Sequence, residues 1–199
     1  HELRGAREKL IPLLDTERED IRNATTELLA RLYREDWESL TDQLMGTERR
    51  SRLQGLLRTL GLLRDPKTSS FFLQFMKHED PEVRSAAADG AYLSSILSTD
   101  EWLPYLEDPQ ESVRLSALRG VGLSLNHVLL GKIAHHVEDP SILIRRELAF
   151  LLGKQPLHED ARPKEILKLL LADENPTVRL ASAYSLFHLG LPNTAQTVR

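Results

Sequence analysis

The amino-acid sequence predicts an all-α protein, an α-α superhelix (solenoid) of about six helical hairpins. About one residue in five of its 199 is leucine while aromatic residues reach only 6%, and this composition favours helices over strands. A short motif of Asp or Asn, Pro, and then Val or Ile before Arg returns along the chain, which is the signature of a repeat protein. Apolar residues on either side of the motif follow the i, i+3, i+4 spacing of one helix face.

The motif marks the same point in each repeat. It reads DPEVR at 80–84, DPQESVR at 108–114, DPSILIR at 139–145 and NPTVR at 175–179, so its arginines are 30, 31 and 34 residues apart. An earlier relative, EDIR, ends at Arg22, and the 62 residues from there to Arg84 leave room for one degenerate copy centred on Arg52. The approximate repeats are 3–34, 35–64, 65–98, 99–126, 127–156 and 157–191.

Each repeat is expected to begin with a leucine-rich first helix, whose apolar stripe is clearest at Leu10, Leu13 and Leu14. The Asp/Asn–Pro step then ends that helix, because the residue before proline avoids the α region. Proline suits the first turn of the following helix, which the Asp or Asn side chain can cap.

The second helix of each repeat follows the motif. Small residues come soon after the arginine, as at Ala86 and Ala87, and larger apolar ones come later, as at Leu151 and Leu152. Small residues let paired helices approach closely and the larger ones fill the space between them. Gly120 and Gly122 fall inside such a helix, where close packing against a neighbour explains them.

Composition limits the classes to which the chain can belong. A net charge of −4 and the absence of cysteine argue against a duplex-binding surface, a disulfide scaffold and a thiol nucleophile. No apolar stretch approaches the ~18 residues that cross a bilayer, so no membrane partner is expected. We interpret residues 1–199 as a single solenoid, a piece of a longer protein, because the chain begins at His1 and its end lacks a capping helix. The default location is the cytoplasm, with a removed signal segment left open.

The repeat pattern from about Leu3 to Leu191 resembles that of the HEAT repeat family. More narrowly, it resembles the short bacterial type related to phycobilin lyase subunits. In that family the aspartate of the turn and the arginine of the second helix form a ladder between neighbouring repeats. By matching position, the resemblance implies this structural role for Arg22, Asp80, Arg84, Asp108, Arg114, Asp139, Arg145, Asn175 and Arg179. Asn175 departs from the aspartate pattern, which implies a neutral hydrogen bond there. Packing between repeats explains a recurring arginine more simply than several active sites do.

Candidate metal ligands are expected to be ordinary residues. The HEAT-like deoxyhypusine hydroxylases hold two irons through His-Glu dipeptides, but the dipeptides at 1–2, 78–79 and 158–159 do not occupy equivalent positions in the repeats. His135 and His136 are adjacent, so on an α-helix they point about 100° apart and are not expected to share a metal. The sequence contains no G-x-S-x-G elbow or phosphate-binding loop. It therefore predicts no catalytic residue, no metal and no cofactor.

One basic concentration stands out, formed by Arg49, Arg50, Arg52, Arg58 and Arg64. Glu48 and Asp65 flank it, whereas a duplex binder should show a dominant basic stripe. We therefore interpret the cluster as a solvated helix face.

The predicted binding surface is the concave groove that stacked second helices form. If the Val or Ile before the motif arginine faces the core, then positions one and five after the arginine face the groove. In the second repeat these positions hold Leu53 and Leu57. In the last three repeats they are Leu115, Arg119, Arg146, Phe150, Leu180 and Tyr184. Such a mixture of aliphatic, aromatic and arginine side chains is typical of protein interfaces, although a shift of one residue in helical phase would return it to the core.

The sequence thus favours a non-catalytic protein–protein interaction scaffold that binds a helix or extended segment of another protein in this groove. The alternative is a phycobilin lyase-type subunit that attaches or detaches a tetrapyrrole, which rests on the resemblance alone. A HEAT-like nucleic-acid-binding or repair protein is the third and weakest interpretation.

Overall fold

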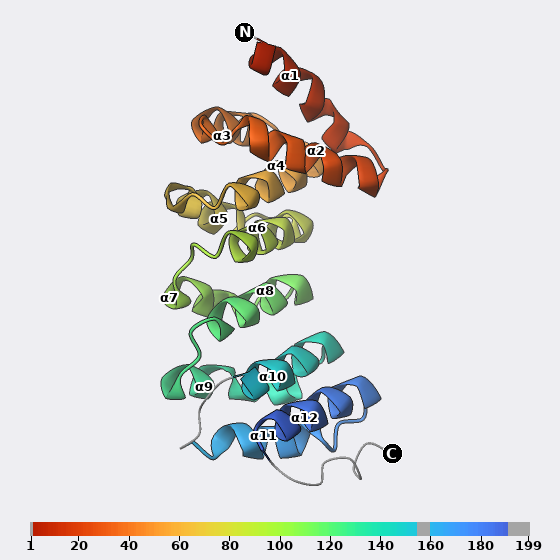
Figure 1. Ribbon diagram of the computed structural model, residues 1–199, viewed down its shortest axis with the longest axis vertical. Coiled ribbons are helices and arrows are strands. Elements are labelled where there is room, and N and C mark those ends of the chain that lie inside the picture. Colours follow the sequence, from red (N-terminus) through yellow and green to blue (C-terminus); the bar gives the residue numbers. More distant parts are fainter. Residues whose placement is uncertain (1, 155–159, 191–199) are drawn as a thin grey trace. The chain divides into compact units, whose positions relative to one another are not determined.

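The computed structural model describes residues 2–154 and 160–190, and every element in these ranges is an α-helix or a 3₁₀-helix (Figure 1). The predicted all-α fold of paired helices is confirmed. None of the helices described is long and apolar enough to span a membrane.

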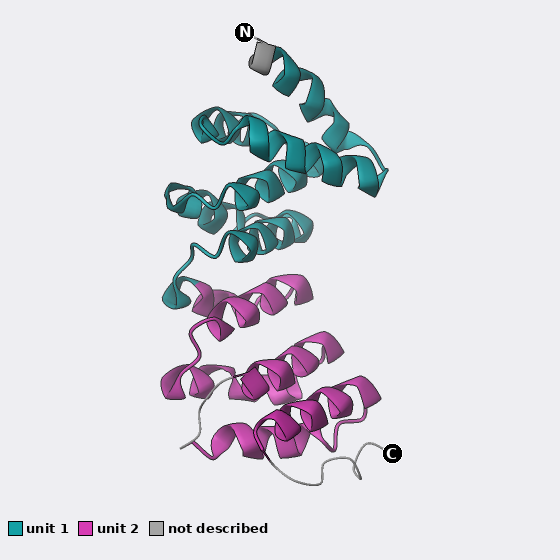
Figure 2. Ribbon diagram, viewed as in Figure 1, with its two compact units in different colours: residues 1–101 teal, residues 102–199 magenta. Residues whose placement is uncertain are grey.

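The chain divides into two compact units, residues 1–101 and 102–199 (Figure 2). In the following, η denotes a 3₁₀-helix. The hairpins of the first unit are α1 (Glu2–Leu10) and η1 (Ile11–Asp15) with α2 (Glu19–Leu32), α3 (Trp37–Met45) with α4 (Arg50–Leu63), and η2 (Pro66–Thr68) and α5 (Ser69–Phe75) with α6 (Pro81–Ser94).

The second unit is built in the same way. Its hairpins are α7 (Thr99–Trp102, beginning just before the unit boundary) and η3 (Leu103–Tyr105) with α8 (Glu111–Gly122), α9 (His127–Ile133) and η4 (Ala134–Glu138) with α10 (Ile142–Lys154), and α11 (Arg162–Leu170) with α12 (Pro176–His188).

Apolar side chains from both helices of each hairpin form the core of each unit. In the second unit the residues directly before the motif arginines, Val113, Ile144 and Val178, are fully buried. Glycines allow the second helices to approach one another: a Cβ at Gly122 would lie 2.5 Å from Leu151, and one at Gly153 would lie 2.5 Å from Ser185. At Gly120 a Cβ would lie 2.4 Å from the buried ring of Trp102. The expected close packing at these glycines is therefore what the structure shows.

The motif arginine closes the turn of its own repeat. In Arg114, Arg145 and Arg179, Nη1 donates to the backbone carbonyl oxygens five and six residues earlier, at 2.8–3.4 Å. Arg84 makes the same two bonds, to the carbonyls of His78 and Glu79. These bonds satisfy carbonyl groups that the end of the first helix leaves without a donor.

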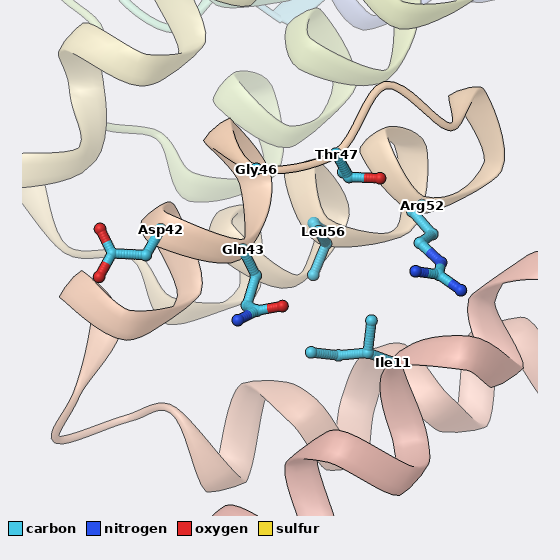
Figure 3. Close-up of a pocket in the computed structure, with 7 residues that line it drawn as sticks. All are labelled: Ile11, Asp42, Gln43, Gly46, Thr47, Arg52 and Leu56. Atoms are coloured by element: carbon cyan, nitrogen blue, oxygen red, sulfur yellow. The ribbon is translucent and has the colours of Figure 1, made fainter.

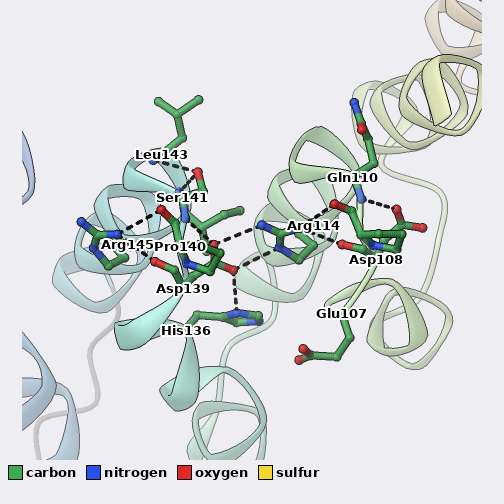
Figure 4. A network of polar contacts seen from close by, with 12 residues as sticks. Glu107, Asp108, Gln110, Arg114, His136, Asp139, Pro140, Ser141, Leu143 and Arg145 are labelled. Carbon is green, nitrogen blue, oxygen red and sulfur yellow. Dashed lines mark hydrogen bonds and ion pairs between the residues drawn. The ribbon is translucent and has the colours of Figure 1, made fainter.

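The other edge of the guanidinium reaches the next repeat in the second unit. Arg114 donates from Nε and Nη2 to the carboxylate of Asp139, both at 3.1 Å (Figure 4). Arg145 donates to Asp173 at 2.7 and 3.1 Å. These four side chains are at most 11% exposed, so the two pairs are buried and bidentate.

We call the carboxylate that pairs with the motif arginine of the preceding repeat the ladder position. For Arg145 this residue is Asp173 and not Asn175. Asp173 lies six residues before Arg179, as Asp139 does before Arg145, and accepts a hydrogen bond from the Asn175 amide. Asn175 lies four residues before Arg179 and caps α12 by accepting from the Thr177 amide at 2.9 Å. Aligning the repeats at the Asp/Asn–Pro step assigned the ladder position to Asn175. The neutral hydrogen bond implied there is wrong, because the residue that pairs with Arg145 is the charged Asp173.

The same distinction separates Asp80 from Asp108. Asp80 lies four residues before its arginine and caps α6 through the Glu82 amide at 2.9 Å. Asp108 lies six residues before Arg114 and accepts from the Gln110 amide at 2.8 Å. An aspartate four residues before the motif arginine therefore caps the second helix, and one six residues before it occupies the ladder position. The Asp–Pro dipeptide alone does not distinguish the two.

The arginines of the first unit meet other carboxylates. Arg49 and Arg52 both pair with Asp15, at 3.0 and 2.8 Å, and Arg50 pairs with Asp80 at 2.5 Å. Arg22 donates to the carbonyl of Thr16 in its own turn. The degenerate repeat has Gly46 six residues before Arg52, so this repeat provides no carboxylate at the ladder position.

Candidate partner-binding face

The six side chains predicted to line the groove lie on the second helices of the second unit, and none is buried. Leu180 and Tyr184 in α12 are 59% and 56% exposed. The remaining four, on α8 and α10, are half-buried. The residues just before the motif arginines are fully buried, so these helices have the phase that the motif implies. We call the six residues Leu115, Arg119, Arg146, Phe150, Leu180 and Tyr184 the second-helix face.

In the first unit the expected outward orientation of Leu53 and Leu57 is wrong, because both side chains are buried in α4. The degenerate repeat has Ser51, not valine or isoleucine, before Arg52. Without that apolar residue to mark the core side, the phase taken from the other repeats does not apply.

Aromatic rings join α10 to α12 on the second-helix face. The rings of Phe150 and Tyr184 meet edge to face with centroids 6.3 Å apart. Tyr184 also contacts the ring of His188 one turn further along, at 4.3 Å. Such pairs hold the rings in place while leaving Tyr184 largely exposed, which presents a preformed apolar surface.

Phe187 extends this surface and was not found by sequence reasoning. Its side chain is 70% exposed, and its ring lies 5.9 Å from that of His188. Phe187 lies eight residues after Arg179, where the preceding repeats have Gly122 and Gly153. The signal that would have found it is this replacement of a close-packing glycine by a large aromatic residue.

The two arginines of the second-helix face differ in their surroundings. Arg119 forms an ion pair with Glu147 at 3.0 Å. The guanidinium of Arg146 makes no hydrogen bond or ion pair within the described ranges. An unpaired guanidinium beside apolar side chains offers a charge-assisted hydrogen bond to an incoming carboxylate.

Several other candidate residues from the sequence form hydrogen bonds or ion pairs within the protein. Arg49, Arg50 and Arg52, three of the five arginines in the basic concentration, are paired with Asp15 or Asp80. His78 accepts a hydrogen bond from the Asp80 amide at 3.0 Å, and His127 lies 2.7 Å from Asp160. The dipeptides at 1–2 and 158–159 include His1, His158 and Glu159, which lie outside the described residues.

A pocket of about 220 Å³ lies in the first unit, between η1, α3 and α4 (Figure 3). Its lining residues are Ile11, Asp42, Gln43, Gly46, Thr47, Arg52 and Leu56. The guanidinium of Arg52 is already bound to Asp15. The lining has no histidine and no cysteine.

Comparisons with known proteins agree with the helical-repeat architecture. No protein-family model and no curated protein matches the chain. Among solved structures, an engineered protein is similar with a TM-score of 0.55 and 15% identity, over 92% of this chain and 98% of that one. At this identity the likeness concerns the fold alone.

Two natural proteins are similar at lower TM-scores. Human deoxyhypusine hydroxylase, solved in complex with glycerol, has a TM-score of 0.42 and 17% identity over 97% of this chain and 76% of that one. The complex of CpcE and CpcF of phycocyanin lyase from Nostoc sp. PCC7120 has a TM-score of 0.41 and 18% identity. The match covers 96% of this chain and 91% of that one. The arrangement of the helices defines the class by itself: this chain is an all-α helical-repeat protein.

Proposed function

We propose that this chain is a HEAT-type interaction module without a catalytic step of its own. It binds a helix or extended segment of a partner protein along the second-helix face, where the repeat pattern predicts the concave groove. The observation that carries the proposal is the exposure of large apolar side chains on α12, where Leu180 and Tyr184 are more than half exposed, next to the half-buried Phe150 of α10.

The side chains of the second-helix face indicate which kind of partner segment would bind there. Leu180, Tyr184 and the adjoining Phe187 favour apolar side chains, since aromatic anchors supply much of the binding energy at interfaces. Arg146 favours a carboxylate next to them. The expected ligand is an amphipathic segment with an acidic residue beside its apolar ones.

The experiment is capture of partners from a lysate of the source organism, followed by calorimetric titration of the protein recovered. Leu180→Asp is the test variant, and Leu169→Asp on the first helix α11 is its matched control. Leu169 is 63% exposed against 59% for Leu180, so neither change should alter stability by more than about 0.5 kcal/mol.

Leu180→Asp is expected to weaken binding by at least about tenfold, or ~1.4 kcal/mol, while Leu169→Asp binds like the unaltered chain. Equal binding by both variants would place the partner elsewhere and refute the proposal. A tetrapyrrole recovered in place of a protein, detected by its visible absorption, would support the lyase-type alternative instead.

A further inference from the structure

Three side chains with metal-ligand chemistry meet at one point of the second unit. Glu107 follows η3, and His135 and His136 lie in η4 of the next repeat. One ligand atom from each lies within 4.8 Å of the other two, and His135 Nε2 is 2.6 Å from Glu107 Oε1. The two imidazole centroids are 4.2 Å apart. The expectation that adjacent histidines diverge assumed an α-helix, and it is wrong for this 3₁₀ segment.

His136 provides a second, independent observation. Its side chain is 2% exposed, and its Nε2 is buried without a hydrogen-bond partner among the residues described. A buried polar atom left without a partner costs free energy. Its other ring nitrogen, Nδ1, faces Asp139 Oδ2 at 3.5 Å, and Arg114 holds that carboxylate in place (Figure 4).

This environment is that of a metal-binding histidine. Such histidines place one ring nitrogen on the metal and direct the other toward a carboxylate or carbonyl, which fixes the ring orientation. When Nδ1 carries the proton and directs it at Asp139, the lone pair that can bind a metal lies on Nε2.

We propose that Glu107, His135 and His136 form a binding site for a divalent transition-metal ion, with zinc as the ion of best fit and a fourth position for water. Two imidazoles and one carboxylate are a known ligand set for zinc. Zinc–ligand bonds of about 2.0–2.2 Å place tetrahedral ligands roughly 3.3 Å apart. The side chains of Glu107 and His135 are 69% and 55% exposed, so both can rotate to reach this separation while His136 stays in place.

A bound ion would link two successive repeats beside the Arg114–Asp139 pair. Glu107 and His135 are 28 residues apart, so the ion would join segments that are distant in the chain. An ion that binds the folded chain and not the unfolded one raises stability with its concentration. The site is separate from the second-helix face, and the proposal is independent of partner binding.

The experiment uses the whole chain, prepared without a histidine tag and stripped with a chelator. Zinc is titrated in competition with a chromophoric chelator, and cobalt(II) is titrated while its visible spectrum is recorded. We expect one ion per chain, a tetrahedral cobalt spectrum and a thermal midpoint that rises with zinc. Glu107→Gln and His135→Ala should each weaken zinc binding by at least about tenfold, since loss of an outer-shell partner alone costs about 10–100-fold.

Both test variants change exposed side chains, and circular dichroism verifies their fold, so His136 is left intact. Glu111→Gln and His127→Ala, also exposed, are the matched controls and should bind zinc like the unaltered chain. Three outcomes overturn the proposal: no saturable binding of one zinc ion, unchanged affinity in Glu107→Gln or His135→Ala, or a comparable loss in His127→Ala.

Discussion

At the scale of single residues, the motif arginine combines two tasks. Nη1 of Arg145 donates to the carbonyl of Asp139 in its own turn, while Nε and Nη2 hold Asp173 in the next repeat. The planar guanidinium can do both because its donors point along separate edges, whereas a lysine ammonium has no such fixed fork. Removing one partner of a buried pair leaves the other charge without compensation.

Arg145→Ala is therefore expected to lower the free energy of unfolding by about 3 kcal/mol. The exposed pair of Arg18 with Asp20, whose side chains are 69% and 67% exposed, provides the control. Arg18→Ala should cost about 0–1 kcal/mol. Urea denaturation measures both, and a similar small loss for the two variants would mean that the ladder contributes little to stability.

The ladder carboxylates also predict a pH dependence. Burial by itself would raise the pKa of Asp173, but the hydrogen bonds from Arg145 and the Asn175 amide outweigh it, so the pKa is lowered. The balance is the same for Asp139, with Arg114 and the Ser141 amide as donors. A carboxylate with a lowered folded pKa stabilises the protein in full above the unfolded value of about 3.9 and loses this contribution as the pH falls through the folded pKa.

We expect the free energy of unfolding to fall as the pH is lowered below about 4, and Asp173→Asn to reduce that fall. The variant should be less stable than the unaltered chain at pH 7 and converge with it in acid. Chemical denaturation from pH 7 to 3 gives the curves, with Asp100→Asn as a matched exposed substitution. Parallel curves for Asp173→Asn and the unaltered chain would contradict this linkage.

At the scale of elements, glycine determines how closely second helices approach. A Cβ on Gly61 in α4 would lie 2.6 Å from the carbonyl oxygen and 2.8 Å from the Cα of Gly90 in α6. These neighbours are backbone atoms, so the clash is relieved only by moving the helices apart. A Cβ on Gly131 in α9 would have no such neighbour within 4 Å.

Gly61→Ala and Gly131→Ala should consequently change stability in opposite directions. Alanine in place of an interior helical glycine gains about 1 kcal/mol from helix propensity, and this gain should appear undiminished at Gly131. At Gly61 it is opposed by overpacking of about 1–3 kcal/mol, so a net loss is expected. Thermal denaturation compares them, and stabilisation by both changes would disprove the close approach of α4 and α6.

At the scale of the whole molecule, helices within each unit contact chiefly those of the same or the adjacent repeat, and the stability of such arrays is a sum of local terms. The chain also divides into two compact units, 1–101 and 102–199. Local stability can therefore differ between them, as hydrogen exchange detects.

Gly61→Ala is accordingly expected to speed amide exchange in helices of the first unit, and Arg145→Ala to do so in helices of the second. Hydrogen exchange read by mass spectrometry, peptide by peptide, resolves the two. Loss of protection across both units in either variant would show that the chain unfolds as one cooperative body.

The repeat period, the pairing of helices and the phase of the second helices in the second unit could all be predicted from the sequence. Each depends on residues within about one helical turn: proline ends a helix, Asp or Asn caps the next, and apolar spacing marks its buried side. The same local chemistry placed Leu180 and Tyr184 outward. It failed at Leu53 and Leu57, where the degenerate motif lacks its apolar marker.

Tertiary structure determined which distant side chains meet. Arg145 donates a hydrogen bond to Asp173 and not to Asn175, and Asp173 is 28 residues away in the chain. Glu107 contacts His135, which is also 28 residues away. These contacts depend on the register with which one repeat packs on the next. A local pattern does not encode that register, because it results from how side-chain volumes fill the space between neighbouring repeats.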